Sequence, residues 1–114
     1  LLPLPPSVNR LYSNATGIGR IKTKAYRSWE NEAGLRLNLA RPAPIKGPFT
    51  IEIHAKRPNQ RRRDLGNLEK AVSDLLVKHG VIEDDSLMER LVMEWSEEIE
   101  SGILVVISPV GNRT

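Results

Sequence analysis

The sequence predicts an α+β fold: a two-layer single domain over residues 1–114, with a mixed β-sheet and two main helices. Three observations predict it. Two segments have apolar residues at helical spacing, three have the alternating or β-branched pattern of strands, and proline and glycine separate them. The length of 114 residues is close to the common size of one domain.

Two segments have the apolar periodicity of an amphipathic helix. The first covers residues 24–40, where four side chains recur at three- and four-residue steps: Tyr26, Trp29, Ala33 and Leu37. The second covers residues 65–79, with leucine, alanine and valine on one face. Asp64 stands at the expected N-cap of this second helix, and Gly80 follows its expected end.

The strand signals follow the first helix. Residues 49–56 alternate apolar and polar side chains, residues 91–95 do so more weakly, and residues 103–107 are strongly β-branched. The proline-rich residues 2–7 predict an extended edge segment, with a polyproline ligand as the alternative. Residues 9–24 lack apolar periodicity, which predicts a mobile surface loop.

Composition excludes several classes of protein. Hydrophobic residues make up 39% and charged residues 27% of the chain, as in ordinary soluble globular proteins. The absence of cysteine excludes a disulfide scaffold and a thiolate zinc site. No apolar run approaches the roughly 18 residues of a membrane helix. We therefore expect no membrane partner and a cytoplasmic location.

The charge is unevenly distributed. The net charge is +3 and the isoelectric point is about 9.5, which is compatible with nucleic acid without requiring it. Lysine and arginine concentrate in residues 20–27 and 56–63, whereas acidic residues concentrate in residues 83–85 and 94–100. This separation suits a basic DNA-facing surface beside an acidic metal pocket. Tyr12 is the aromatic residue that we expect nearest to DNA.

Three arginines, Arg61 to Arg63, run directly into the start of the second helix. Arginine forms bidentate bonds with phosphate, and a helix N-terminus favours an anion, so a DNA backbone fits this junction. The alternative is a solvated charge run beside an ordinary Asp64 cap. Lys70 shares a helix face with Gly66 and Asn67, from which it could stabilise the charge of a phosphate undergoing hydrolysis.

The alternative for Lys70 is a surface lysine paired with Glu69 or Asp74. A second candidate is the acidic run of residues 83–85, which follows the Gly80 stop. Phosphodiester hydrolysis uses a cation such as Mg²⁺, which is held by carboxylate oxygens. Asp64 and the end of the acidic run can meet only if the chain returns along the helix. The alternative for the acidic run is a polar turn before a strand.

The chain resembles the RusA family of Holliday-junction resolvases. The resemblance spans most of its length and is carried by residues 4–10 (LPPSVNR), by residues 61–71 (RRRDLGNLEKA) and by residues 80–85 (GVIEDD). These are similar in order and spacing to the family's P-P-S-x-N, R-R-D-x-D-N-x-x-K and G-x-x-x-D-D segments.

The resemblance implies a homodimeric, Mg²⁺-dependent endonuclease, with Mn²⁺ able to substitute. Such an enzyme nicks two strands symmetrically across a four-way DNA junction, and a two-fold dimer suits that task. Bacteria and phages encode members of the family, which act in DNA recombination and repair. By position, Asp64, Lys70 and Asp85 would be the catalytic residues, with Asp64 and Asp85 as metal ligands and Asp84 as a further ligand.

Gly66 departs from the family pattern, because it stands where the second aspartate of the motif would be a metal ligand. Three explanations stay open. The chain is a natural variant that uses Asp84 or Glu83 instead, a degenerate copy that binds junctions without cutting, or an engineered inactive form. The loss of one carboxylate should weaken metal binding in each case.

Three functions therefore compete. The first is a junction-resolving endonuclease, the second a non-catalytic module that binds branched DNA, and the third an interaction protein that binds an acidic partner. All three use a basic surface, and the third also uses the proline-rich start of the chain. We expect that surface to comprise Arg61, Arg62, Arg63, Asn67, Arg10, Arg20, Lys22 and Lys24.

Overall fold

The computed structural model describes residues 1–6, 11–15, 19–57 and 65–110. The elements in chain order are β1 (Tyr12–Ala15), β2 (Gly19–Lys22), α1 (Lys24–Ala40), β3 (Phe49–Ala55), the 3₁₀ turn η2 (Leu65–Leu68), α2 (Glu69–Lys78), the 3₁₀ turn η3 (Asp85–Leu87), β4 (Met88–Trp95) and β5 (Ile103–Pro109). Within the described residues, neither helix is long and apolar enough to cross a bilayer.

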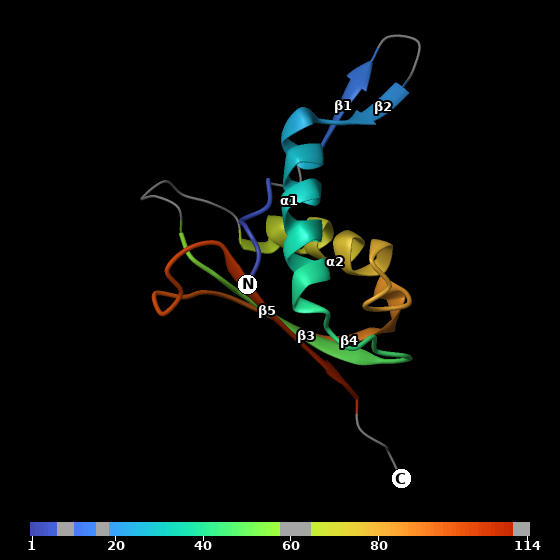
Figure 1. Ribbon diagram of the computed structural model, residues 1–114, viewed down its shortest axis with the longest axis vertical. Coiled ribbons are helices and arrows are strands. Elements are labelled where there is room, and N and C mark those ends of the chain that lie inside the picture. Colours follow the sequence, from blue (N-terminus) through green and yellow to red (C-terminus); the bar gives the residue numbers. More distant parts are fainter. Residues whose placement is uncertain (7–10, 16–18, 58–64, 111–114) are drawn as a thin grey trace.

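The main sheet has the order β4-β3-β5, with β3 at its centre. β3 is parallel to β4 and antiparallel to β5, so the predicted mixed sheet is confirmed. Both helices lie on one side of this sheet (Figure 1). Every second side chain of β3 is fully buried beneath them: Phe49, Ile51, Ile53 and Ala55. The predicted two-layer α+β architecture with two main helices is therefore confirmed.

α1 has the predicted bounds, because both of its ends are capped. The Thr23 hydroxyl accepts a hydrogen bond from the Tyr26 backbone N–H at 3.2 Å. At the other end, Arg41 adopts a left-handed conformation and donates its N–H to Leu37. The four apolar side chains that predicted the helix are all buried: Tyr26, Trp29, Ala33 and Leu37.

The second predicted helix has a tighter start than its periodicity suggested. Its first turn, η2, is a 3₁₀ turn, and the α-helical part begins at Glu69 without a side-chain cap. Asp64, the predicted N-cap, lies outside the described residues. Gly80 ends the helix as predicted: its φ is 71°, and its N–H donates to the Val77 carbonyl.

The prediction of a loop over residues 9–24 is wrong for the described part of that segment. β1 and β2 form an antiparallel hairpin in which Tyr12 pairs with Lys22. This hairpin projects beyond the start of α1 (Figure 1). Its strands have four residues each, too few for a readable alternation. Two features of Leu11 anchor the base of the hairpin. Its side chain is fully buried, and its carbonyl accepts a hydrogen bond of 2.9 Å from the Thr23 N–H.

The N-terminal segment is attached to the edge of the sheet at Leu2. Leu2 and Ile103 exchange two backbone hydrogen bonds of 2.8 Å, as predicted for an extended edge segment. Gly102, beside this bridge, has a φ of 72°, and a Cβ at this position would overlap the Leu2 carbonyl oxygen. Glycine is therefore required at residue 102 for two reasons, its backbone conformation and the close approach of Leu2.

Gly102→Ala should lower the free energy of unfolding by at least about 2 kcal/mol, because it adds a backbone clash to left-handed strain. Gly47→Ala is the matched control, since Gly47 has a φ of 77° but open space around it. It should cost only about 1 kcal/mol. Denaturant unfolding monitored by tryptophan fluorescence measures both values. Equal losses would show that the Leu2 contact adds nothing.

Candidate functional site

Lys70 lies in the first turn of α2 and is paired. Its ammonium donates to the Asp74 carboxylate at 3.2 Å, one helical turn further along. Glu69, the other predicted partner, instead accepts a hydrogen bond of 2.6 Å from the Ser73 hydroxyl. The hydrogen bond and charge of Asp74 are the main causes that raise the pKa of Lys70, with smaller contributions from Tyr12 and Asp85. Lys70 is therefore held in its cationic form.

η3 brings Asp85 back to α2. The turn packs against the helix, and Asp85 lies within electrostatic reach of Glu69, Lys70 and Asp74. From the sequence, the acidic run could meet the start of the helix only if the chain after the helix turned back along it. The structure has this turn at η3. Asp64, with which Asp85 was predicted to share a metal, lies outside the described residues.

Asp84 and Asp85 form an exposed acidic pair. The Asp84 carboxylate caps η3 by accepting the Ser86 N–H at 3.0 Å, and this hydrogen bond lowers the pKa of Asp84. Asp85 has a raised pKa, first because of its hydrogen bond to Asp84 and then because of burial and the neighbouring negative charges. The two adjacent carboxylates repel each other when both are ionised, so one pKa falls and the other rises. A cation bound nearby would offset this repulsion and favour ionisation of both.

The donor set of this pair suits a hard cation. Exposed carboxylate oxygens are the ligands that Mg²⁺ prefers. Glu83 is less suitable, because its carboxylate accepts the Gly47 N–H at 2.6 Å. Within the described residues, no three histidine, cysteine, aspartate or glutamate side chains converge as a metal site. The acidic pair therefore supplies part of a ligand set, and a further ligand would have to come from outside the described part of the chain.

The predicted DNA-binding residues that the structure describes fall into two groups. Arg20 is exposed on the hairpin, with its guanidinium 4.3 Å from the centre of the Tyr12 ring, and Lys24 is exposed at the start of α1. Lys22 is half-buried and bonded to Glu30 at 3.1 Å, and Asn67 is half-buried in η2. The remaining predicted contacts lie outside the described residues: Arg10, Arg61, Arg62 and Arg63.

A contact between the hairpin and α1 was not predicted. The Tyr12 and Tyr26 rings meet edge to face with centroids 5.7 Å apart. Burial, followed by the charges of Glu30 and Asp74, raises the pKa of Tyr26. The helical spacing of Tyr26 and Glu30 was visible in the sequence, but no local pattern indicates that Tyr12 packs against them.

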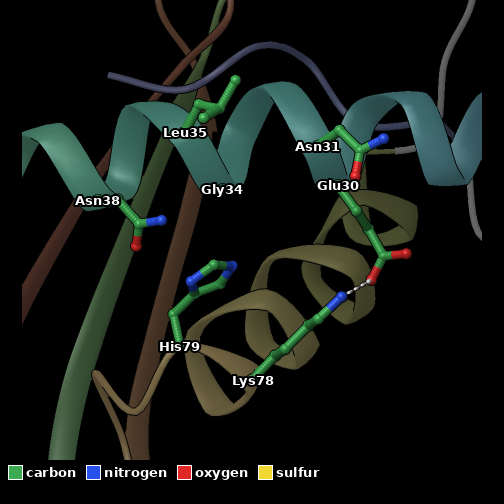
Figure 2. A pocket seen from close by; sticks show the side chains of 7 residues that line it. All are labelled: Glu30, Asn31, Gly34, Leu35, Asn38, Lys78 and His79. Carbon is green, nitrogen blue, oxygen red and sulfur yellow. Dashed lines mark ion pairs between the residues drawn. The ribbon is translucent and has the colours of Figure 1, made fainter.

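A hollow lies at the C-terminal end of α2, away from Lys70. Figure 2 shows it between α1 and the end of α2, with the Lys78 ammonium directed at Glu30 and the His79 ring beneath Gly34. Its volume is about 330 Å³. Glu30 is buried and satisfied by Lys22 at 3.1 Å and Lys78 at 3.8 Å. These ion pairs tie the helices and hairpin together, and the hollow lies roughly 12 Å along α2 from Lys70.

Known proteins are similar in sequence to this chain over nearly its whole length. The profile of the family described as Endodeoxyribonuclease RusA matches residues 3–108. A crossover junction endodeoxyribonuclease RusA of Escherichia coli K12 is 36% identical over 113 residues, which cover 98% of this chain and 94% of the relative. The protein of the same name from Enterobacteria phage 82 is 38% identical over 117 residues, with the same coverage.

The fold and site therefore belong to a protein of the endodeoxyribonuclease class. The chain is a member of the RusA family, as its motifs indicated. Relatives occur in bacteria, including Shigella sonnei at 36% identity, and in a phage.

Asp84→Asn should lower the pKa of Asp85, because a neutral amide replaces the carboxylate that stabilises its protonated form. Carboxyl ¹³C NMR titration of the metal-free protein measures this change. Glu97 is the internal control: its pKa is lowered by Lys56, and it should not respond. An unchanged pKa of Asp85 would show that the two carboxyls do not interact.

Proposed function

We propose that this chain is a Mg²⁺-dependent endonuclease that resolves four-way (Holliday) DNA junctions by paired symmetric nicks during recombination and repair. Membership of the RusA family supports the reaction class. The observation that carries the proposal for this chain is the return of η3 along α2, because it gathers Lys70 and the Asp84–Asp85 pair at one place. Residues 1–114 act in this proposal as one endonuclease domain.

Each residue of the site has a distinct task. Lys70 places a positive charge where the phosphate gains negative charge during hydrolysis. Asp85 and Asp84, together with Asp64, would hold the metal through their oxygens. A bound Mg²⁺, for which Mn²⁺ can substitute, supplies a Lewis acid and lowers the pKa of a coordinated water. Asp74 keeps the lysine protonated and therefore able to perform its task.

The DNA surface in this proposal runs from the hairpin to the start of α2. Arg20 and Lys24 are its exposed described members. The other proposed DNA contacts are Asn67, Lys22 and four residues that lie outside the described part of the chain: Arg10, Arg61, Arg62 and Arg63. In this proposal the protein acts as a homodimer, because two equivalent strands of a junction require two equivalent sites. It acts in the bacterial cytoplasm, and its gene is bacterial or phage-encoded.

Gly66 supports a second candidate function, a branched-DNA-binding module without catalysis. The residue is exposed in η2, four positions before Lys70, where the family motif has an aspartate ligand. A glycine has no side-chain oxygen with which to ligate a metal. In this alternative, the same basic surface binds the junction, and the strands stay uncut.

Cleavage of a synthetic mobile four-way junction separates these functions. We expect the chain to nick symmetrically only at raised Mg²⁺ or Mn²⁺, and Gly66→Asp to lower the metal concentration required by about tenfold or more. Asp64→Asn and Lys70→Ala should each reduce the cleavage rate by about 10²-fold or more. Denaturing gels of end-labelled strands measure the rates.

One outcome would decide against catalysis, and another against the ligand assignment. If the chain and Gly66→Asp bind the junction with equal affinity and neither cuts it, the protein is a binding module. If Gly66→Asp cuts and Asp64→Asn cuts equally well, the enzyme class stands but the ligand assignment is wrong.

Junction binding should depend steeply on salt, because phosphate contacts release counterions. Arg20→Ala should weaken binding and reduce the slope of log K against log salt by about one. Arg36→Ala is the matched control, since Arg36 is an exposed arginine on α1 that is paired with Glu32. Fluorescence anisotropy at several salt concentrations measures both variants. Identical slopes for the two variants would remove Arg20 from the DNA surface.

A further inference from the structure

We propose that Asp74 is a positioning residue that holds the Lys70 ammonium along α2, the helix against which η3 packs, before DNA binds. This inference rests on the proposed role of Lys70 and deepens it. It assigns a function to a residue of α2 that contacts neither substrate nor metal in the proposed mechanism.

The first step of the argument is the ion pair itself. A lysine side chain has several rotatable bonds, and an exposed lysine without a partner samples many conformations. The 3.2 Å bond to Asp74 selects those in which the ammonium lies along α2. Because η3 packs against α2, these conformations keep the ammonium on the helix that lies next to Asp85.

The second step is that Asp74 is itself partly buried. Its side chain is 34% exposed, so about two thirds of it is covered by the protein. Its charge acts on Tyr26, which is 1% exposed and belongs to the core. Tyr12 of the hairpin meets Tyr26 edge to face. Asp74 is thus a partly covered carboxylate within electrostatic reach of a core side chain.

A second pair on the same protein shows why this setting matters. Arg36 and Glu32 form an ion pair of the same spacing at 3.1 Å on α1. Both side chains are about half exposed, at 48% and 57%, and such pairs hold long side chains only weakly. Asp74 differs because it is less exposed, at 34%, and because its charge acts on the buried Tyr26. The Glu32–Arg36 pair is consequently the matched control.

The test separates cleavage from binding. Single-turnover cleavage rates and junction affinities are measured for Asp74→Asn, Asp74→Glu and Glu32→Gln, in the chain as it is and with Gly66→Asp. We expect Asp74→Asn to slow cleavage about tenfold while changing affinity less than twofold, since misplacing a catalytic group lowers the rate of the chemical step. Asp74→Glu should recover part of the rate, and Glu32→Gln should change nothing.

A double-variant comparison shows whether Asp74 acts through Lys70. In a Lys70→Ala background, followed to long reaction times, Asp74→Asn should cause no further loss. An equal loss in both backgrounds would overturn the inference, as would a fall in affinity that matches the fall in rate.

A spectroscopic measurement keeps the inference independent of cleavage. The pKa of Lys70, read from its ¹³Cε resonance, should fall in Asp74→Asn and stay unchanged in Glu32→Gln. If neither the chain nor Gly66→Asp cuts DNA while this shift is present, the proposed enzyme function fails but Asp74 still positions Lys70. An unchanged pKa of Lys70 in Asp74→Asn overturns the inference whether or not the protein cuts.

Discussion

The parallel pairing of β3 with β4 is the constraint on which the site depends. Two adjacent parallel strands cannot be joined by a tight turn, so the chain must cross over between the end of β3 and the start of β4. α2 and η3 both lie in this crossover. Burial of one face of β3 fixes α2 above the sheet, and the start of β4 fixes η3 beside α2. The lysine and the acidic pair therefore meet because both belong to one connection.

The charges gathered by this connection are unbalanced. Glu69, Asp74 and Asp84 all act on Asp85, whereas Asp74 and Asp85 act on Lys70. In the proposed function, a DNA phosphate is repelled by these carboxylates until a cation compensates them, whereas the exposed Arg20 of the hairpin attracts the backbone. Because exposed charges are screened beyond about 8 Å at physiological salt, each group acts only on the part of the duplex nearest to it.

The sequence predicted most of the fold because its signals are local. The bounds of α1 and the central strand followed from periodicity, and Gly80 marked the end of α2 through its left-handed conformation. The hairpin was missed because four-residue strands have no readable period and gain their stability from Leu11 and Tyr26. In the candidate site, motif spacing predicted roles for Lys70 and Asp85. The contact of Tyr12 with Tyr26 joins two separate elements, and no spacing rule contains it.

The buried carboxylate of Glu30 explains how the hairpin comes to be part of the site. It is bonded to Lys22 of β2 and lies 3.8 Å from Lys78 of α2, so one residue of α1 connects both neighbouring elements. Buried ion pairs contribute little net stability, because desolvation offsets their attraction, but they restrict which groups can meet. Here they hold the hairpin and α2 against α1, where the Tyr12 ring meets the Tyr26 ring edge to face. One buried carboxylate thereby ties the hairpin and the helix that bears Lys70 to the same element.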